Sequence, residues 1–345
     1  MSDAVAVSAA YRLFSEVCRT RQIDIKPLCG GRVLVLSKRG ITANVYGWDF
    51  GVNSATALLV CRNKAACSAL LQDRGIPCVP HEVFYRPDRE VFGFVYDASW
   101  SRMIEFFGAH PAGVVCKPND LSRGIGVRRV SSVPQLEKAA YEVFRFSREL
   151  SLSPFVSIDA EYRVVVFNGR CRLMYVKRLP VVMGDGASML GELIAAAHDQ
   201  EWTDVPLGGL LEDVEQTRRI TYVPARDELV RVGWRHNFTH GARAELLDAA
   251  SPELRQIVDM AEGAARALGV VLAAVDVVNN AGNYHVLEVN TGILTTHLLQ
   301  QLPSARPIVK ELFGAVVEHL FELVEASERG SYGHGGLTGG TNGAQ

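Results

Sequence analysis

The stretch V-D-V-V-N-N-A-G-N-Y-H-V-L-E-V-N, residues 275–290, carries most of the information about the fold. Apolar residues flank its polar ones, and Ala281-Gly282-Asn283 can form the turn between two paired strands. Glu288 and Asn290 are two residues apart, so both side chains project from one face of their strand. Asp276 can lie opposite them. The stretch therefore predicts a β-hairpin with an oxygen-lined face.

Two carboxylates and an amide suit Mg²⁺, which takes few protein ligands together with phosphate oxygens and water. Asp276, Glu288 and Asn290 are therefore candidate metal ligands beside a bound nucleotide. The alternative is that alternating polar residues only form the solvated face of a strand. The apolar neighbours indicate a core strand and favour the metal site.

A second candidate feature is a lysine at the end of an apolar strand, followed by a glycine loop. Glycines let backbone N–H groups converge on phosphate oxygens, and a lysine on the strand adds a positive charge. Taken alone, the two glycines fit an ordinary hairpin turn better than a phosphate loop, and they do not open a helix as a dinucleotide-binding fingerprint would. The residues concerned are Lys117, Ser122, Arg123, Gly124 and Gly126.

The remaining candidates are cations that would otherwise be interpreted as solvated surface. Arg163 lies in an apolar β run, where an unpaired charge would be costly, so we expect a buried anion or carboxylate partner. Lys64, Lys177 and Arg235 are further cations of this kind. His236 and His240 have helical spacing without a third ligand nearby, so we expect no zinc site.

Composition restricts the class of protein. A chain of 345 residues with 48% hydrophobic content can bury a large core. Thirty-six basic residues balance 38 acidic ones without a long run of either sign, so we expect neither a nucleic-acid nor a membrane partner. Seven cysteines without a Cys-x-x-Cys spacing predict reduced thiols, and the absence of a signal segment predicts a cytoplasmic location.

The periodicity predicts a mixture of helices and antiparallel strands, an α+β or α/β fold. Asn168-Gly169 favours a tight hairpin turn, and Asn63 can cap a helix. We expect helices at 8–22, 63–73, 133–148, 188–198 and 252–268. We expect strands at 32–37, 41–46, 161–167, 171–178, 270–279 and 284–290.

Taken in order, these residues resemble the ATP-grasp superfamily from about Ser8 to Leu323. The segments R-N-K-A-A-C-S-A-L-L-Q-D-R-G-I-P-C-V-P (62–80) and V-V-M-G-D-G-A-S-M-L-G-E-L-I (181–194) resemble cyanophycin synthetases and the ATP-grasp module of bifunctional glutathione synthetases. The segment W-R-H-N-F-T-H-G-A (234–242) is similar to ribosomal-protein glutamate ligases. N-T-G-I-L-T-T-H-L-L (290–299) is similar to D-alanine–D-alanine ligases.

The resemblance implies an ATP-grasp fold, in which two β-rich lobes clamp ATP, together with a small N-terminal α/β lobe over residues 1–60. The ATP-grasp region would span 61–328 and would be followed by a disordered Gly-rich tail, 329–345. Within that region we expect lead-in elements at 62–112, an ATP-binding lobe at 113–180 and a C-terminal lobe with the metal site at 181–328.

The resemblance also implies roles for single residues. Nucleotide binding falls to Lys64, Lys117, Lys177 and the loop from Ser122 to Gly126, with Asp159 as the candidate for the ribose. The acyl phosphate or the substrate would be contacted by Arg163, Arg235 and Asn237. One or two Mg²⁺ ions, or Mn²⁺, would be held by Asp276, Glu288 and Asn290.

The activity that follows from the resemblance is ATP-dependent ligation of a carboxylate to an amine through an acyl phosphate, with release of ADP and phosphate. The substrates would be amino acids or short peptides, and stand-alone relatives imply a homodimer or homotetramer. Three alternatives remain open: an ATP-grasp kinase that phosphorylates without ligation, a nucleotide-binding pseudoenzyme, and a structural or interaction protein without a nucleotide site.

Overall fold

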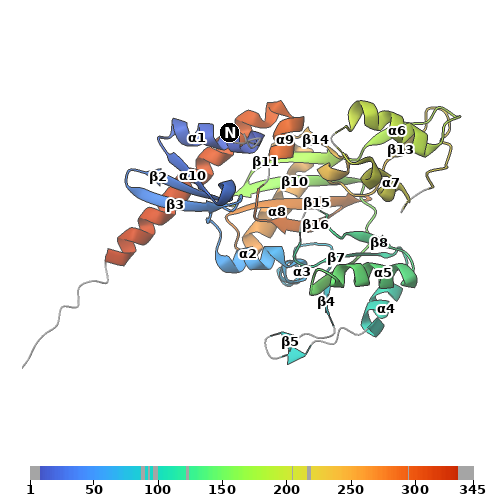
Figure 1. Ribbon diagram of the computed structural model, residues 1–345. Coiled ribbons are helices and arrows are strands. Elements are labelled where there is room, and N and C mark those ends of the chain that lie inside the picture. Colours follow the sequence, from blue (N-terminus) through green and yellow to red (C-terminus); the bar gives the residue numbers. More distant parts are fainter. Residues whose placement is uncertain are drawn as a thin grey trace, which may run out of the picture. The chain divides into compact units, whose positions relative to one another are not determined.

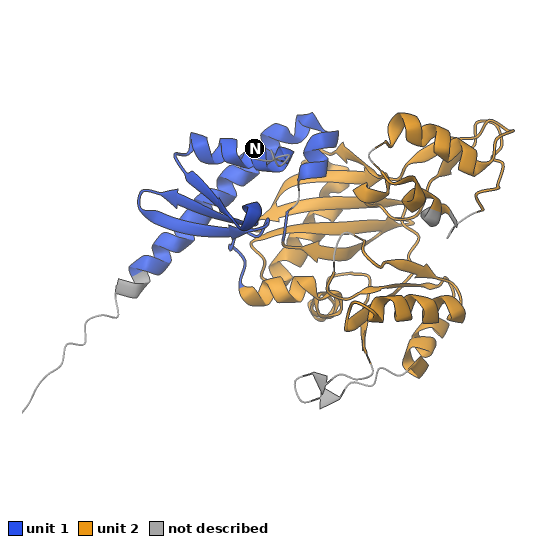
Figure 2. Cartoon of the chain, viewed as in Figure 1, with its two compact units in different colours: residues 1–54, 292–345 blue, residues 55–291 orange. Residues whose placement is uncertain are grey.

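The computed structural model describes residues 8–86, 90–91, 94–95, 100–121, 124–203, 205–215, 219–293 and 295–332. The chain forms two compact units (Figure 2). Unit 1 contains residues 1–54 and 292–345, and unit 2 contains residues 55–291. Both ends of the chain therefore belong to unit 1, including 292–328, which the expected division assigned to the C-terminal lobe.

Unit 1 combines a three-stranded antiparallel sheet with helices from both ends of the chain (Figure 1). The first helix packs against the last, which also contacts the third strand. Trp48 stacks on Phe313, with ring centroids 5.8 Å apart, and Phe14 packs edge-on against Phe313. The elements are α1 (Ala9–Thr20), β1 (Asp24–Leu28), β2 (Val33–Lys38), β3 (Ile41–Tyr46), α9 (Thr296–Gln301) and α10 (Arg306–Tyr332).

Helix α10 continues to Tyr332, beyond Arg329, where a disordered tail was expected to begin. The buried side chains of this helix, from Val309 to Phe321, all precede that point. Residues 329–332, which were expected to belong to the tail, are therefore part of the helix. The Gly-rich residues 333–345 lie outside the described part of the chain.

A five-stranded antiparallel sheet forms the centre of unit 2, in the order β14-β11-β10-β15-β16. The turn at Asn168-Gly169 has positive φ at both residues, 51° and 71°, as expected for a tight hairpin. Ala281 and Gly282 turn the second hairpin in the same way. Both predicted hairpins are confirmed. The strands are β10 (Ala160–Phe167), β11 (Arg170–Arg178), β14 (Arg243–Leu246), β15 (Leu272–Asn280) and β16 (Asn283–Asn290).

Helices of unit 2 pack against this sheet. The apolar face of α8 (Arg255–Ala267), with Ile257 and Ala261, packs on β10 and β15, and α2 (Ala55–Arg62) and α3 (Lys64–Asp73) contact β16. Asn63 caps α3, because its side-chain oxygen accepts a hydrogen bond from the Ala66 N–H at 2.9 Å. The cap confirms the predicted start of α3 and places Lys64 in its first turn.

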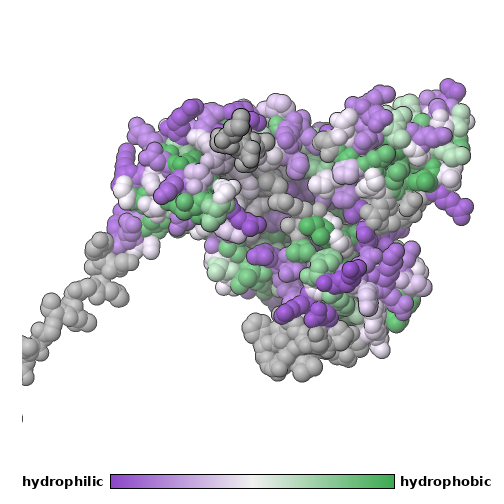
Figure 3. Space-filling view, viewed as in Figure 1, coloured by the Kyte–Doolittle hydropathy of each residue, from purple (hydrophilic) through white to green (hydrophobic). Residues whose placement is uncertain are grey.

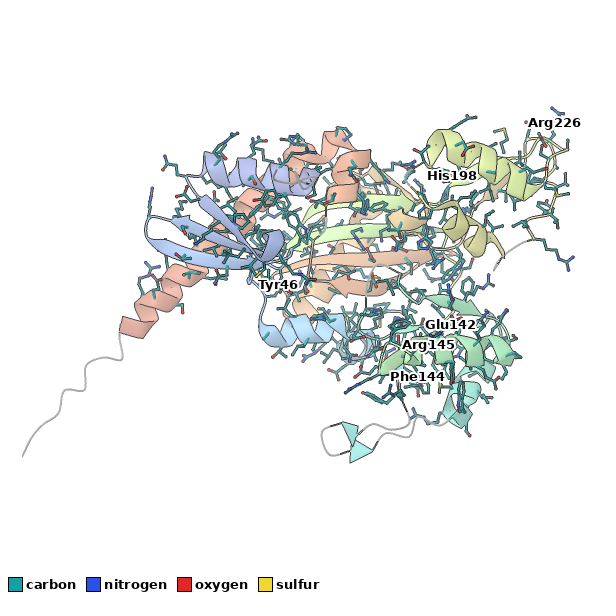
Figure 4. All side chains as sticks on the ribbon, viewed as in Figure 1. Tyr46, Glu142, Phe144, Arg145, His198 and Arg226 are labelled. Carbon is teal, nitrogen blue, oxygen red and sulfur yellow. The ribbon has the colours of Figure 1, made fainter. Side chains whose placement is uncertain are left out.

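A four-stranded sheet in the order β4-β9-β7-β8 forms a second part of unit 2. Cys116 and Leu152 on one face pack against Val143 of α5. Figure 4 labels Glu142 and Arg145 near the end of that helix, which stops at Phe144 rather than Arg148. The elements are β4 (Glu82–Tyr85), α4 (Trp100–Gly108), β7 (Val114–Pro118), β8 (Arg128–Val130), α5 (Val133–Phe144) and β9 (Glu149–Pro154).

A third part of unit 2 has its own small core around Trp202 and Val230. His198 bonds the Val205 carbonyl oxygen at 2.7 Å and ties helix α6 to the following loop (Figure 4). Apolar residues are exposed in the upper right of Figure 3, the region that this part occupies. Its elements are β12 (Val181–Met183), α6 (Leu190–Glu201), α7 (Leu207–Glu215) and β13 (Leu229–Arg231).

Strands β5 (Glu90–Val91) and β6 (Phe94–Val95) pair in a short hairpin. Among the helices that the structure describes, none has both the length and the apolar character of a membrane span.

Candidate active site

A buried ion pair joins two central strands of the five-stranded sheet. Arg163 on β10 lies opposite Asp276 on β15. Its Nε donates to Oδ1 at 2.7 Å and its Nη2 donates to Oδ2 at 2.6 Å, in a bidentate arrangement. Asp276 is only 1% exposed. The carboxylate partner expected for Arg163 is therefore one of the candidate metal ligands.

Lys177 and Glu161 extend this ion pair into a network. Lys177 on β11 lies opposite Glu161 and donates from Nζ to Glu161 Oε1, and the same Nζ lies 3.2 Å from Asp276 Oδ2. His236 Nδ1 lies 4.0 Å from the other Glu161 oxygen. All of these side chains are buried except Arg163, which is partly exposed.

Glu161 is a site residue to which the sequence analysis assigned no role. The signal that could have identified it is its spacing of two from Arg163, because residues i and i+2 of a strand share a face.

The pKa values of the two carboxylates in the network shift in opposite directions. Burial raises the pKa of Glu161 to about 7, although Lys177 opposes this shift. Burial would also raise the pKa of Asp276, but the charges of Arg163 and Lys177 outweigh it and hold that pKa well below its usual range. Asp276 therefore remains ionised, as a metal ligand must be.

The candidate metal ligands lie together at the end of the β15–β16 hairpin. Asp276 is the register partner of Glu288, and Asn290 Nδ2 donates to Glu288 Oε1 at 2.8 Å. Since the side-chain nitrogen of Asn290 is used in this bond, its side-chain oxygen, Oδ1, is the atom available to coordinate a cation. Within the described residues no three His, Cys, Asp or Glu side chains form a metal-binding group, so the third ligand here would be the amide. Two carboxylates and an amide oxygen fit Mg²⁺ completed by phosphate oxygens and water.

The two candidate phosphate-binding lysines lie close to these acids. Lys64 Nζ donates to the carbonyl oxygens of Asn119 and Leu121, at 3.3 and 2.5 Å. A narrow cavity lined by Lys64 and Glu288 separates α3 from β16. Burial lowers the pKa of Lys117 to about 8, with a further contribution from the charge of Lys64. Two neighbouring ammonium groups, one buried and one half-buried, favour an anion near them.

The glycine loop contacts the segment that contains Arg235 and Asn237. A Cβ built on Gly124, whose φ is +73°, would lie 3.0 Å from Asn237 Nδ2. Arg235 Nη1 donates to the Val127 carbonyl oxygen at 3.5 Å. The backbone after the loop and the two candidate substrate-binding residues are thus brought together. Ser122 and Arg123 lie outside the described residues.

Asp159 lies beside the turn of the β15–β16 hairpin, and its assignment to the ribose stays a prediction. Its Oδ2 accepts a hydrogen bond from the Ala281 N–H at 2.7 Å, at the turn of the β15–β16 hairpin. No described contact joins it to the charged network. Its carboxylate stabilises the turn. Glu161, two residues further along the chain, is the acid that belongs to the buried network.

The buried histidine of the network predicts a loss of stability in acid. Burial, with Lys177 and Arg231, lowers the pKa of His236 from 6.5 to about 4. Between pH 6.5 and 4 the unfolded chain takes up a proton at this position and the folded protein does not, so falling pH favours unfolding by on the order of 2 kcal/mol. We expect urea denaturation to show this loss in the wild type and a shallower one in His236→Gln. His319→Gln is the control and should lose stability with falling pH as the wild type does. If the unfolding free energy of His236→Gln depended on pH as steeply as that of the wild type, other groups would cause the loss.

Comparison with known proteins supports the predicted resemblance. No family model matches the sequence. The chain is 26% identical over 234 residues to a glutathione biosynthesis bifunctional protein of Mannheimia succiniciproducens, covering 60% of this chain and 30% of that protein. It is 23% identical over 312 residues to the corresponding protein of Lactiplantibacillus plantarum (84% and 39%), and 25% identical over 279 residues to cyanophycin synthetase of Trichormus variabilis (75% and 29%). The chain thus spans less than two fifths of the length of these relatives.

Two solved structures share the fold. A bifunctional glutathione synthetase from Pasteurella multocida superposes with a TM-score of 0.54 at 18% identity, covering 92% of this chain and 44% of the other. D-alanine–D-alanine ligase from Bacillus anthracis superposes with a TM-score of 0.50 at 14% identity, covering 81% and 72%. With the sequence similarities, these superpositions confirm that the chain has the predicted ATP-grasp fold and is related to glutathione and cyanophycin synthetases.

Proposed function

We propose that this protein is an ATP-dependent ligase that joins the carboxylate of an amino acid or short peptide to an amine through an acyl phosphate. The observation that carries the proposal is the arrangement of Asp276, Glu288 and Asn290 beside Lys64 and Lys117 within one compact unit. A set of acidic oxygens next to two ammonium groups suits a nucleotide whose phosphates are bound together with Mg²⁺.

The residues divide the chemistry between them. Bound Mg²⁺ would neutralise charge that develops on the phosphates. Lys64 and Lys117 hold the phosphates in place by charge, while Arg163 and Lys177 keep Asp276 ionised and oriented. Positioning and charge neutralisation of this kind account for most catalysis of phosphoryl transfer.

Arg235 and Asn237 contact the backbone of the glycine loop and the residue after it, and we assign them to the binding of the substrate carboxylate. An oxygen of that carboxylate attacks the γ-phosphorus, ADP leaves, and the amine nitrogen then attacks the acyl carbon as phosphate leaves. The amine proton passes to solvent. The glycine loop over the site would exclude water from the acyl phosphate.

Phosphate release is expected only when ATP, Mg²⁺, a carboxylate and an amine are present together. Pairs of amino acids and short peptides would be screened for released phosphate, with mass spectrometry of the product and separation of ADP from AMP. Hydroxylamine in place of the amine should trap the acyl phosphate as a hydroxamate.

The same assay separates the alternatives. ADP formed with one substrate and no free phosphate would indicate a kinase, and AMP with pyrophosphate would contradict the mechanism. MgATP binding without any product, across the whole screen, would indicate a pseudoenzyme.

A further inference from the structure

His81 lies beside the two phosphate-binding lysines, and neither predicted function nor sequence motif involves it. Its backbone N–H donates to Ser68 Oγ of α3 at 3.1 Å, which fixes the start of β4 against that helix. Both ring nitrogens are shielded from solvent, and neither has a hydrogen-bond partner among the described residues. Since buried polar groups are normally paired, an imidazole with two unused nitrogens suggests a missing ligand.

The face of the four-stranded sheet that carries His81 is polar although it is buried. Val83, two residues after His81, is the register partner of Ser151, which pairs in turn with Lys117. The Ser151 hydroxyl is also buried without a hydrogen bond among the described residues. The opposite face of this sheet forms the apolar core with α5. The polar face therefore offers unused hydrogen-bonding groups next to an ammonium group.

The charges around His81 come from two elements. Lys117 of β7 and Lys64 of α3 face it, and burial together with these two charges lowers the pKa of His81 well below 6.5. The acids nearby, Glu288 and Glu161, act on Lys117. The Val79 carbonyl is the one neighbour that favours the protonated ring, although it does not reach hydrogen-bond geometry. His81 is therefore neutral while no phosphate is bound.

An anion in the pocket would reverse this balance. It would offset the charges of Lys64 and Lys117 at His81 and accept a hydrogen bond from the ring. A protonated imidazole donates from both nitrogens, so the Val79 carbonyl could take one and the anion the other. Hydrogen bonds from a charged donor to phosphate are among the stronger ones in proteins.

We propose that His81 is a third anion-binding group of the nucleotide pocket, which takes up a proton from solvent when the nucleotide phosphates bind and donates a hydrogen bond to a phosphate oxygen. The inference rests on the proposed nucleotide site and adds a pH dependence to it. Nucleotide affinity should rise as the pH falls from 8 towards 6, because protonation of His81 then costs less.

Calorimetry of ADP binding in buffers of different ionisation enthalpy tests the proposal. At pH 6.5 we expect the wild type to take up as much as about one proton more per ADP than His81→Asn takes up. The difference between the two proteins does not contain the proton uptake of ADP itself, because ADP contributes equally to both. We expect the variant to bind ADP about 10-fold more weakly at pH 6.5 and only ~2-fold more weakly at pH 8.5. His319→Gln, on α10 of unit 1, should match the wild type. Adenosine, which has no phosphate, should show no difference between the proteins.

NMR of the histidine Cε1–H resonances in the wild type gives a second measurement that does not depend on how the variant folds. Saturating ADP should shift the His81 resonance from the neutral to the protonated position at pH 6.5. A resonance that stays neutral, with equal proton counts in the wild type and His81→Asn, would overturn the role of His81 alone. Failure of the wild type to bind ADP would instead overturn the nucleotide site and the proposed function with it.

Discussion

Replacing Glu288 by glutamine is expected to lower the rate of phosphate release by about 100- to 1,000-fold while the protein stays folded. The amide removes one negative charge from the set that would hold Mg²⁺, and so weakens charge stabilisation at the phosphates. It retains an oxygen that can accept the hydrogen bond from Asn290 Nδ2. The free energy of unfolding, measured with urea, should therefore change by less than about 1 kcal/mol.

Glu245→Gln is the matched control for this experiment. Glu245 lies on β14 of the same sheet and pairs with Arg178 at 2.8 Å, with both side chains 55% exposed. It should keep wild-type turnover. If Glu288→Gln retained near-normal activity over a range of Mg²⁺ concentrations, Glu288 would not be a metal ligand.

Replacing Asp276 by asparagine is expected to destabilise the protein by about 3–5 kcal/mol, the largest effect on stability among the site residues. Asp276 is the buried carboxylate that neutralises Arg163 and also lies 3.2 Å from Lys177. In the variant the neutral amide no longer balances the positive charges of Arg163 and Lys177. One of the two hydrogen bonds from Arg163 also loses its acceptor, because the amide has a single oxygen. Urea and thermal unfolding would measure the loss.

A second substitution tests whether uncompensated charge is the cause. Arg163→Met in the Asp276→Asn background removes one of the stranded cations and should recover part of the lost stability. Glu245→Gln, which breaks an exposed pair in the same sheet, should cost no more than about 1 kcal/mol. Equal costs for Asp276→Asn and Glu245→Gln would mean that the buried network contributes little to folding.

The arrangement of the candidate metal ligands could be predicted from the sequence because strand geometry is local. Spacing of two along a strand and a short turn place Glu288 and Asn290 on one face with Asp276 opposite, and the structure has this arrangement. The cap at Asn63 was equally predictable, since a side-chain oxygen reaches a backbone N–H three residues later.

The partners within the charged network could not be predicted in the same way. Arg163 is 113 residues from Asp276 in the chain, and Lys177 reaches Asp276 across β10. The sequence indicated that Arg163 needed a carboxylate, because an unpaired buried charge is costly, but several acids could have served. Strand order in the sheet made the choice, because it pairs β10 with β15 and so places Asp276 opposite Arg163.

By itself the sequence determined the hairpins, the helix caps and the oxygen-lined face at Asp276, because these depend on hydrogen bonds and side-chain directions within a few residues. Only the tertiary structure decided that residues 292–345 join residues 1–54 in one unit, and that His81, bonded to Ser68 of α3, lies within range of the charges of Lys64 and Lys117. Such long-range neighbours follow from how apolar faces pack, and packing depends on the whole chain at once.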